Sequence, residues 1–410
     1  MRTTTFCALL LSLAACGDDD AVATPDAAVA DDAALPADDA ATDPDGGETD
    51  PDGGGDPTDG GTATADVIRG RFESTGGVRC GTIANWNAPD GPLLRGSMNI
   101  CGDDLDALRD TYVDNLDAIA ARGDHTVMAL GQGLNLPPSW LEACETIPVN
   151  DGRFMGETCA PWDPTYQGLL RDFLIDEVGP AVAGHEALLG VYFTISSMTN
   201  GYEMHFRVTR DDLPDYPGDE TFRAAYLAIM DIYQEAFDVP IVFEAGHCPF
   251  GADPDCETPL ALYRHARDTY GPSQVGVAMW NCSERFFVNE SAPEWETRPL
   301  LEEAAADGVS MGCQTVGSFT NGACRFSSDD IADYGSNIGR DQDACAPSPT
   351  FDPEAACVDT MGWFVGTARR NDESMLIQGT WAENWSADYA PGGIYETSET
   401  CRAAMDAVAY

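Results

Sequence analysis

The chain has 410 residues and a formal net charge of −49 at pH 7, from 70 acidic and 21 basic residues, and it contains no lysine. This balance leaves no basic face that could neutralise phosphates, so a nucleic-acid partner is not expected. Only five histidines are present as candidate bases, which argues against a protease or an esterase that needs a catalytic triad.

Residues 1–16, MRTTTFCALLLSLAAC, join a basic start at Arg2 to a short apolar run and small residues before a cysteine. This pattern is typical of a secretory signal and is too short to span a bilayer. It resembles a bacterial lipoprotein signal, in which Cys16 is the acylated residue of the lipobox. The resemblance implies an exported protein that a lipid at Cys16 anchors in the cell envelope, in the outer membrane or at the cell surface.

Residues 17–64 are built almost wholly from Asp, Ala, Pro, Gly and Thr, without an aromatic residue. Such a segment buries too little apolar area to offset its ordering entropy, and its like charges repel one another. It is therefore predicted to be a disordered acidic linker. The run DPDGGETDPDGGGD faintly resembles a calcium-binding loop, but a solvated spacer is the favoured interpretation.

From residue 65 to 410, short apolar runs alternate with amphipathic segments in which apolar residues recur at helical spacing. The predicted helices are 105–123, 164–178, 222–237, 259–271, 295–308 and 401–410. The predicted strands are 66–72, 81–86, 126–134, 188–196, 239–246, 275–281, 309–315 and 375–383. Most of these strands are continuously apolar, as expected when both faces of a parallel sheet are covered.

Eight strands separated by helices over this length predict an α/β fold, a (β/α)8 TIM barrel that occupies residues 65–410. A doubly wound open sheet is the structural alternative, but no GxGxxG-like turn follows the first strand. In a barrel, residues that bind or react lie at the carboxyl ends of the strands.

Twelve cysteines remain in residues 65–410, an even number that predicts up to six disulfides in an exported chain, with the pairing left open. The stretch HCPFGADPDC offers His247, Cys248 and Cys256 as possible metal ligands. No CxxC spacing supports a metal site there, so a disulfide-closed loop is favoured. Neither a metal nor another cofactor is expected.

Carboxylates, amides and indoles follow the predicted strands at their carboxyl ends. Sugars stack their apolar faces on indole rings and hydrogen-bond to amides and carboxylates, so the pattern predicts a carbohydrate as the partner. The catalytic candidates are Glu203, Glu244 and Glu383. The substrate-binding candidates are Trp86, Trp140, His205, Trp280, Asn281, Gln314, Trp381 and Trp385.

Four segments carry a family resemblance: LNLPPSWL, PWDPTYQGLLRDFL, VYFTISSMTNGYEMHF and GTWAENW. Through their pattern, residues 66–400 resemble the (β/α)8 glycoside hydrolases of the large retaining clan that includes β-galactosidase-like and cellulase-like enzymes. The resemblance implies that Glu203, after the fourth strand, is the general acid/base. The clan places its nucleophilic glutamate on the seventh strand, where this chain has Gln314.

Three interpretations of Gln314 stay open. Glu244 or Glu383 could supply the second carboxylate, the seventh strand could be wrongly aligned, or the barrel could bind glycans without cleaving them. The separation of the two carboxyl groups would distinguish retention, at roughly 5 Å, from inversion, at roughly 6.5 to 9.5 Å. The sequence thus predicts a cell-surface glycoside hydrolase that acts on a polysaccharide or oligosaccharide, with a non-catalytic glycan-binding or structural lipoprotein as the alternative.

Overall fold

The computed structural model describes residues 68–74, 93–133, 136–150, 155–196, 213, 215–244, 258–279, 297–315, 319, 352–364 and 379–409. The expected signal (1–16, with Cys16) and the expected acidic linker (17–64) lie outside these residues and stay predictions. Among the described helices, none combines the length and apolar character that a membrane span requires.

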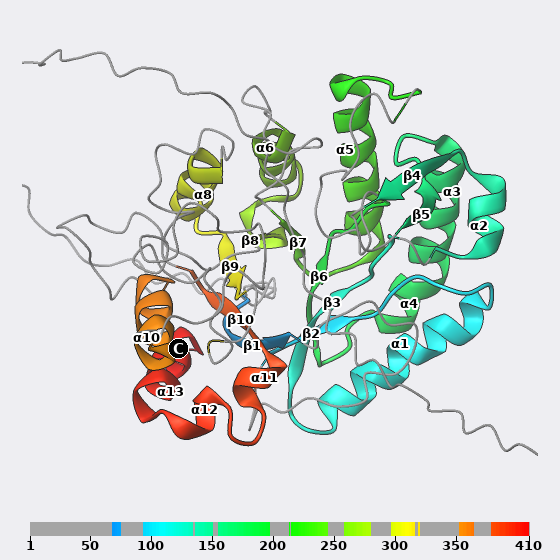
Figure 1. Ribbon diagram of the computed structural model, residues 1–410. Coiled ribbons are helices and arrows are strands. Elements are labelled where there is room, and N and C mark those ends of the chain that lie inside the picture. Colours follow the sequence, from blue (N-terminus) through cyan, green and yellow to red (C-terminus); the bar gives the residue numbers. More distant parts are fainter. Residues whose placement is uncertain are drawn as a thin grey trace, which may run out of the picture.

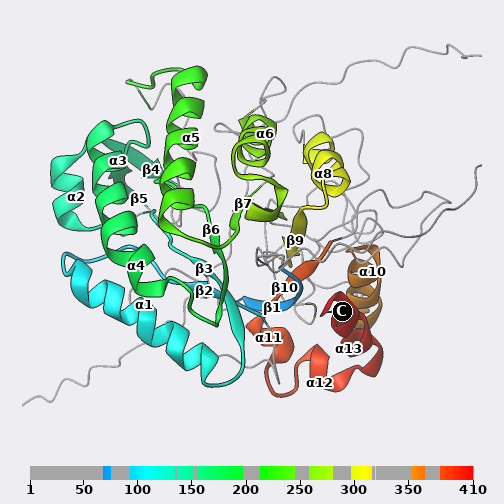
Figure 2. The ribbon, with the colours of Figure 1, turned by 180° about the vertical axis from the view of Figure 1, so that it is seen from behind.

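Eight parallel strands close into a barrel in the order β1-β10-β9-β8-β7-β6-β3-β2, with β2 paired back onto β1. The strands are β1 Gly70–Ser74, β2 Leu93–Ser97, β3 His125–Ala129, β6 Leu188–Tyr192, β7 Ile241–Glu244, β8 Val275–Met279, β9 Ser310–Gln314 and β10 Trp381–Trp385. Helices surround these strands when the molecule is seen from either side (Figure 1, Figure 2). The predicted barrel is therefore confirmed.

Five of the helices between barrel strands match predicted segments, and two, at residues 179–182 and 353–364, were not predicted. The helices are α1 Leu105–Ala120, α3 Pro164–Arg171, α4 Gly179–Val182, α5 Asp219–Ala236, α6 Thr258–Tyr270, α8 Thr297–Ala306 and α10 Pro353–Phe364. Asp104 caps the start of α1 by accepting from the Ala107 amide. Between α3 and α4, the helix widens into a π-helical segment over Asp172–Val178. Pro180, just beyond, has no N–H to give to the preceding turn, which favours such a widening.

Two predicted strands are wrong in position. The second barrel strand is β2, Leu93–Ser97, and not residues 81–86, which lie outside the described residues. The last strand, β10, begins at Trp381, several residues later than predicted. Both errors move candidate residues, because a residue's place along its strand decides whether it lies at the carboxyl end.

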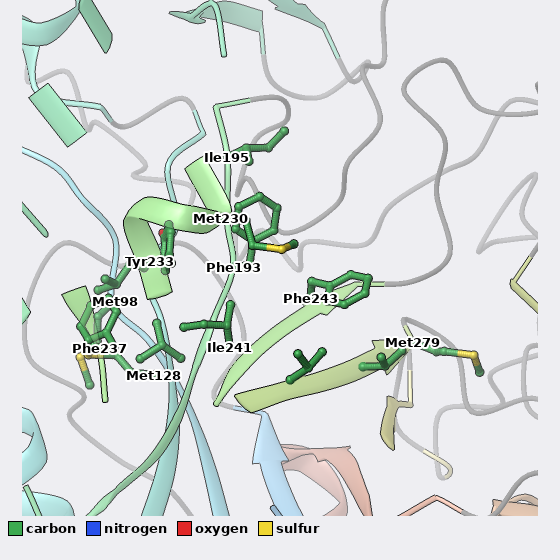
Figure 3. Packing of buried hydrophobic residues seen from close by; sticks show 14 of the residues in the cluster. Met98, Met128, Phe193, Ile195, Met230, Tyr233, Phe237, Ile241, Phe243 and Met279 are labelled. Carbon is green, nitrogen blue, oxygen red and sulfur yellow. The ribbon is translucent and has the colours of Figure 1, made fainter. Parts of the chain in front are cut away.

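The barrel wall separates two groups of apolar side chains. The inner group fills the barrel interior, here called the lumen, and comprises Ile68, Phe72, Val127, Ala129, Tyr192, Val242, Ala278 and Trp381. The outer, larger group packs the strands against the helices. Figure 3 shows Phe193, just after β6, beside Met230 and Tyr233 of α5 in this outer group. Residues two apart on a strand share a face. A strand residue two positions from a member of the inner group therefore faces the lumen, and one two positions from a member of the outer group faces the helices.

An excursion between β3 and α3 was not predicted. It consists of α2 Pro138–Ala143 and the antiparallel strands β4 Thr146–Asn150 and β5 Met155–Cys159. A disulfide between Cys144 and Cys159, with a Cα–Cα distance of 5.7 Å, joins the end of α2 to β5. The Thr158 hydroxyl donates to the Gly133 carbonyl at 3.3 Å and attaches the hairpin to the carboxyl end of β3.

The C-terminal segment packs against β1 and β10. It contains α11 Ser386–Tyr389, α12 Ile394–Thr397 and α13 Glu399–Asp406, and a disulfide between Cys357 and Cys401 joins α10 to α13. Arg71 of β1 donates to the Tyr395 hydroxyl and to the Asp406 carboxylate. These bonds hold the last helices on the first strand.

Candidate active site

Three polar side chains of the lumen lie toward the carboxyl ends of neighbouring strands. Glu244 ends β7 two residues after the inward-facing Val242, and Glu383 follows the inward-facing Trp381 by two residues on β10. Gln314 ends β9 and pairs in register with Glu383. All three therefore share the inner face of the wall.

These side chains are almost fully removed from solvent. Glu244 and Gln314 are each 4% exposed and Glu383 is 1% exposed. Burying a carboxylate is costly unless other groups contact it, so two buried carboxylates in one lumen mark a candidate functional site. The strands β7, β8, β9 and β10 are consecutive in the wall, so three strand spacings of roughly 4.8 Å each separate the backbones that carry the two glutamates.

Tyr192 completes this group from the opposite wall. It is the last residue of β6, and its hydroxyl donates a hydrogen bond to Oε1 of Glu383. Four strand steps separate β6 from β10 in either direction around the barrel, so the bond crosses the lumen. Below it the lumen holds Phe72, Val242 and Trp381, so Tyr192 and Glu383 together form the polar floor of the site.

Trp381 does not lie on the rim, which corrects the prediction that it binds substrate. It opens β10, is 1% exposed and fills the lumen beneath Glu383. One glycine, Gly312, makes room for its indole, and a second, Gly276, lies at ordinary contact distance from it. A Cβ added to Gly312 would lie 1.8 Å from Trp381 Cε2, and one added to Gly276 would lie 3.5 Å from Cη2 and 2.7 Å from Cγ2 of Val242. Trp381 is a core residue of the barrel.

Trp140 is likewise a packing residue and not a sugar platform. It lies in α2, is 3% exposed and makes edge contacts with Tyr166 and Phe173, at ring-centroid distances of 6.5 Å and 6.1 Å. Its predicted place in the substrate site is wrong because the short helix turns the indole into the outer core.

Other predicted residues lie outside the described residues. Glu203, His205, Trp280 and Asn281 are among them, and the side chain of Trp385 is too. Trp86 also lies outside them. It was predicted to end the second strand, but that strand is Leu93–Ser97, so Trp86 does not directly follow a barrel strand.

A buried polar cluster supports the strand ends beside Tyr192. Nε2 of Gln132 donates to the Thr194 hydroxyl at 2.9 Å and to the Tyr233 hydroxyl at 2.7 Å, while the Tyr166 hydroxyl donates to Oε1 of Gln132. Burial raises the pKa of Tyr166 far above its ordinary value, so this hydroxyl stays a neutral donor. The cluster ties the ends of β3 and β6 to α3 and α5, which limits movement of the strand that carries Tyr192.

Tyr192 was not among the predicted site residues, and the prediction that the chain lacks a GxSxG sequence is wrong, because residues 308–312 have this pattern. In α/β-hydrolases this motif places a serine on a sharp turn after a strand. Here Ser310 is the first residue of β9, 7% exposed and at the opposite end of the barrel from Glu244. It is not at a nucleophile elbow. Among the described residues, no group of three His, Cys, Asp or Glu side chains could hold a metal ion.

The chain has only distant similarity to the solved structures that it matches. No family model matches the chain, and no curated protein does. The catalytic domain of a β-amylase from Paenibacillus polymyxa matches with 10% identity and a TM-score of 0.39, over 68% of this chain and 95% of that one. A structure of the pneumococcal virulence factor StrH, described for N-glycan recognition and hydrolysis, matches with 10% identity and a TM-score of 0.42, over 83% of each chain.

An endo-β-1,4-mannanase double mutant from Cellulomonas fimi matches with 12% identity and a TM-score of 0.37, over 83% of this chain and 70% of that one. These structural neighbours are glycoside hydrolases. At such low identities and TM-scores the similarity carries no argument about this chain.

Proposed function

We propose that this chain is a glycoside hydrolase that cleaves an extracellular polysaccharide or oligosaccharide. The observation that carries the proposal is the pair of buried glutamates, Glu244 and Glu383, on the inner face of one barrel at its carboxyl end. In such barrels this end is the place where chemistry occurs. The neighbouring Gln314 offers an amide that suits a sugar hydroxyl.

Two carboxyl groups are what glycoside hydrolysis needs. One donates its proton to the glycosidic oxygen as the bond from this oxygen to the anomeric carbon breaks. The other acts as a carboxylate, either by bonding to the anomeric carbon or by accepting a proton from the attacking water. At the end, the water oxygen is on the sugar and its proton has returned to the pair. Glu383 is one member, and Glu244 or Glu203 is the other.

The cell envelope is the proposed location. A lipid at Cys16 would anchor the chain in the outer membrane, and the acidic segment 17–64 would hold the barrel away from the surface. Two disulfides among the described residues, Cys144–Cys159 and Cys357–Cys401, fit an oxidising compartment. The test is labelling with a radioactive fatty acid, which a Cys16→Ala variant should lose.

The proposed activity is tested by incubating the purified chain with aryl glycosides and with plant and microbial polysaccharides. Glu203→Gln, Glu244→Gln and Glu383→Gln are compared with the parent chain. Glu303→Gln is the matched control, because Glu303 pairs with Arg264 on the outside of the barrel. Loss of hydrolysis in Glu383→Gln and in one further lumen variant, with the control active, supports the proposal.

One observation favours the second candidate function, a barrel that binds glycans without cleaving them. The resemblance places a nucleophilic glutamate on the seventh strand, and the seventh barrel strand, β9, carries Gln314 and no acid. Retention of the parent chain on a glycan column, together with no product from any substrate, would support binding over hydrolysis.

A further inference from the structure

We propose that Tyr192 is a positioning residue that holds Glu383 as the ionised member of the carboxyl pair, so that the proton donor is a different glutamate. This inference rests on the proposed function, because it assigns the roles within the same site. Tyr192 acts on Glu383 and does not itself need to contact the sugar.

The geometry of the hydrogen bond carries the assignment. The Tyr192 hydroxyl donates to Oε1 of Glu383 across the lumen, from a strand on the opposite side of the barrel. Both side chains are buried, at 6% and 1% exposure. A phenol is a neutral donor at all pH values below about 10, and a donor that points at a carboxylate oxygen stabilises the ionised form over the protonated one.

Among the described residues, most of the side chains that line the lumen around Glu383 are apolar. The described side chains that face it from the other strands are Phe72 of β1, Ala129 of β3, Val242 and Glu244 of β7, Ala278 of β8 and Gln314 of β9. On β2, Arg95 pairs in register with Ser74 of β1 and with Val127 of β3. Glu244 is the one described acid among these residues.

The proton must then come from elsewhere. A carboxylate held ionised by a donor is suited to accept a proton or to bond to carbon, and it is a poor acid. Glu244, on the strand next to β6, is a candidate donor among the described residues, and the sequence offers Glu203 as another. The bond also fixes the Glu383 side chain near the barrel axis, where a sugar entering from the carboxyl end would meet it.

Replacement of Tyr192 by phenylalanine tests the inference, because it removes only the hydroxyl. The acidic limb of the pH profile of kcat/KM is expected to move to higher pH by about one unit, with about a tenfold loss of activity on the acidic side. The alkaline limb, which reports the proton donor, is expected to stay in place. An acidic limb that does not move would overturn the proposal.

Tyr263→Phe is the matched control. It also removes a tyrosine hydroxyl that donates to a carboxylate, here Asp307 at 2.6 Å, but it does so on the outside of the barrel between α6 and α8. Its pH profile is expected to match that of the parent chain. A shift as large in Tyr263→Phe as in Tyr192→Phe would show that the effect is not specific to the lumen.

A second measurement separates failure of this inference from failure of the proposed function. Carbon-13 NMR of glutamate-labelled chain follows the Glu383 carboxyl signal, assigned by its disappearance in Glu383→Gln, and needs no substrate. The carboxyl is expected to be ionised at pH 6 in the parent chain and to titrate about one unit higher in Tyr192→Phe. A chain that hydrolyses nothing refutes the hydrolase proposal, whereas a protonated Glu383 at pH 6, or identical titrations, refute the role of Tyr192.

Discussion

The contact between Gly312 and Trp381 gives a sharp test of the lumen packing. A Cβ at position 312 would lie 1.8 Å from Cε2, 2.0 Å from Nε1 and 2.2 Å from Cδ2 of the indole. Carbon atoms in contact are normally about 3.5 to 4.0 Å apart, so the ring would have to move by nearly 2 Å. Overpacking of this kind costs about 1 to 3 kcal/mol, and Gly312→Ala should reach the upper end because Trp381 is 1% exposed and enclosed by strands.

The assay is equilibrium unfolding in urea, followed by tryptophan fluorescence and circular dichroism. Gly168→Ala is the control, because Gly168 lies in α3 and a Cβ added there meets no atom within 4 Å. That control should stabilise the chain by up to about 1 kcal/mol through helix propensity. A double-mutant cycle with Trp381→Phe completes the design. The added methyl should cost less once the indole is gone, and equal costs in both backgrounds, within about 0.5 kcal/mol, would refute the packing.

Three further predictions concern other parts of the chain. Replacing both Cys144 and Cys159 by alanine should lower the free energy of unfolding by about 3 kcal/mol, because their bridge closes a loop of 15 residues; an unchanged urea midpoint would contradict this. The Tyr263 hydroxyl and Arg267 lower the pKa of Asp307 in the folded chain. The ionised Asp307 therefore stabilises the fold above the pKa of an unfolded aspartate, about 3.9, and this stabilisation is lost as the pH falls through the lower pKa of the folded state. Asp307→Asn should therefore destabilise the chain at pH 7 and make no difference near pH 2, and a constant difference between these pH values would be inconsistent with the ion pair. Gln314→Glu adds a carboxylate in register with Glu383, so it should cost more stability at pH 7 than at pH 4, and an equal cost would mean that these side chains do not face each other.

Much of the barrel could be predicted because its central strands are buried on both faces. Residues 188–192, 241–243 and 275–279 are continuously apolar, and the sequence distinguishes them clearly from the helices. The second strand, LLRGS, contains an arginine and a glycine, so GTIANW was preferred. Its membership of the barrel depends on pairing with β1 and β3, which no local pattern reveals.

The positions of two lumen acids were predicted, and the errors at Trp381 and Tyr192 have different causes. Glu244 and Glu383 were recognised as acids at strand ends, but Trp381 was placed on the rim because the start of β10 was set too early. A shift of a few residues along a strand moves a side chain from the rim to the core. Tyr192 was missed because a tyrosine in an apolar run indicates packing, and its bond to a carboxylate 191 residues away depends on closure of the barrel.

The rate of glycoside hydrolysis by Glu383→Gln, compared with the parent chain on the same substrate, tests the central claim most directly. The substitution keeps the size of the side chain and an oxygen that can accept from Tyr192, so folding and retention on a glycan column should be preserved. The account predicts that kcat falls by at least about a hundredfold while the thermal midpoint stays within a few degrees. Hydrolysis by Glu383→Gln at the rate of the parent chain would show that the lumen carboxylates do not carry the reaction.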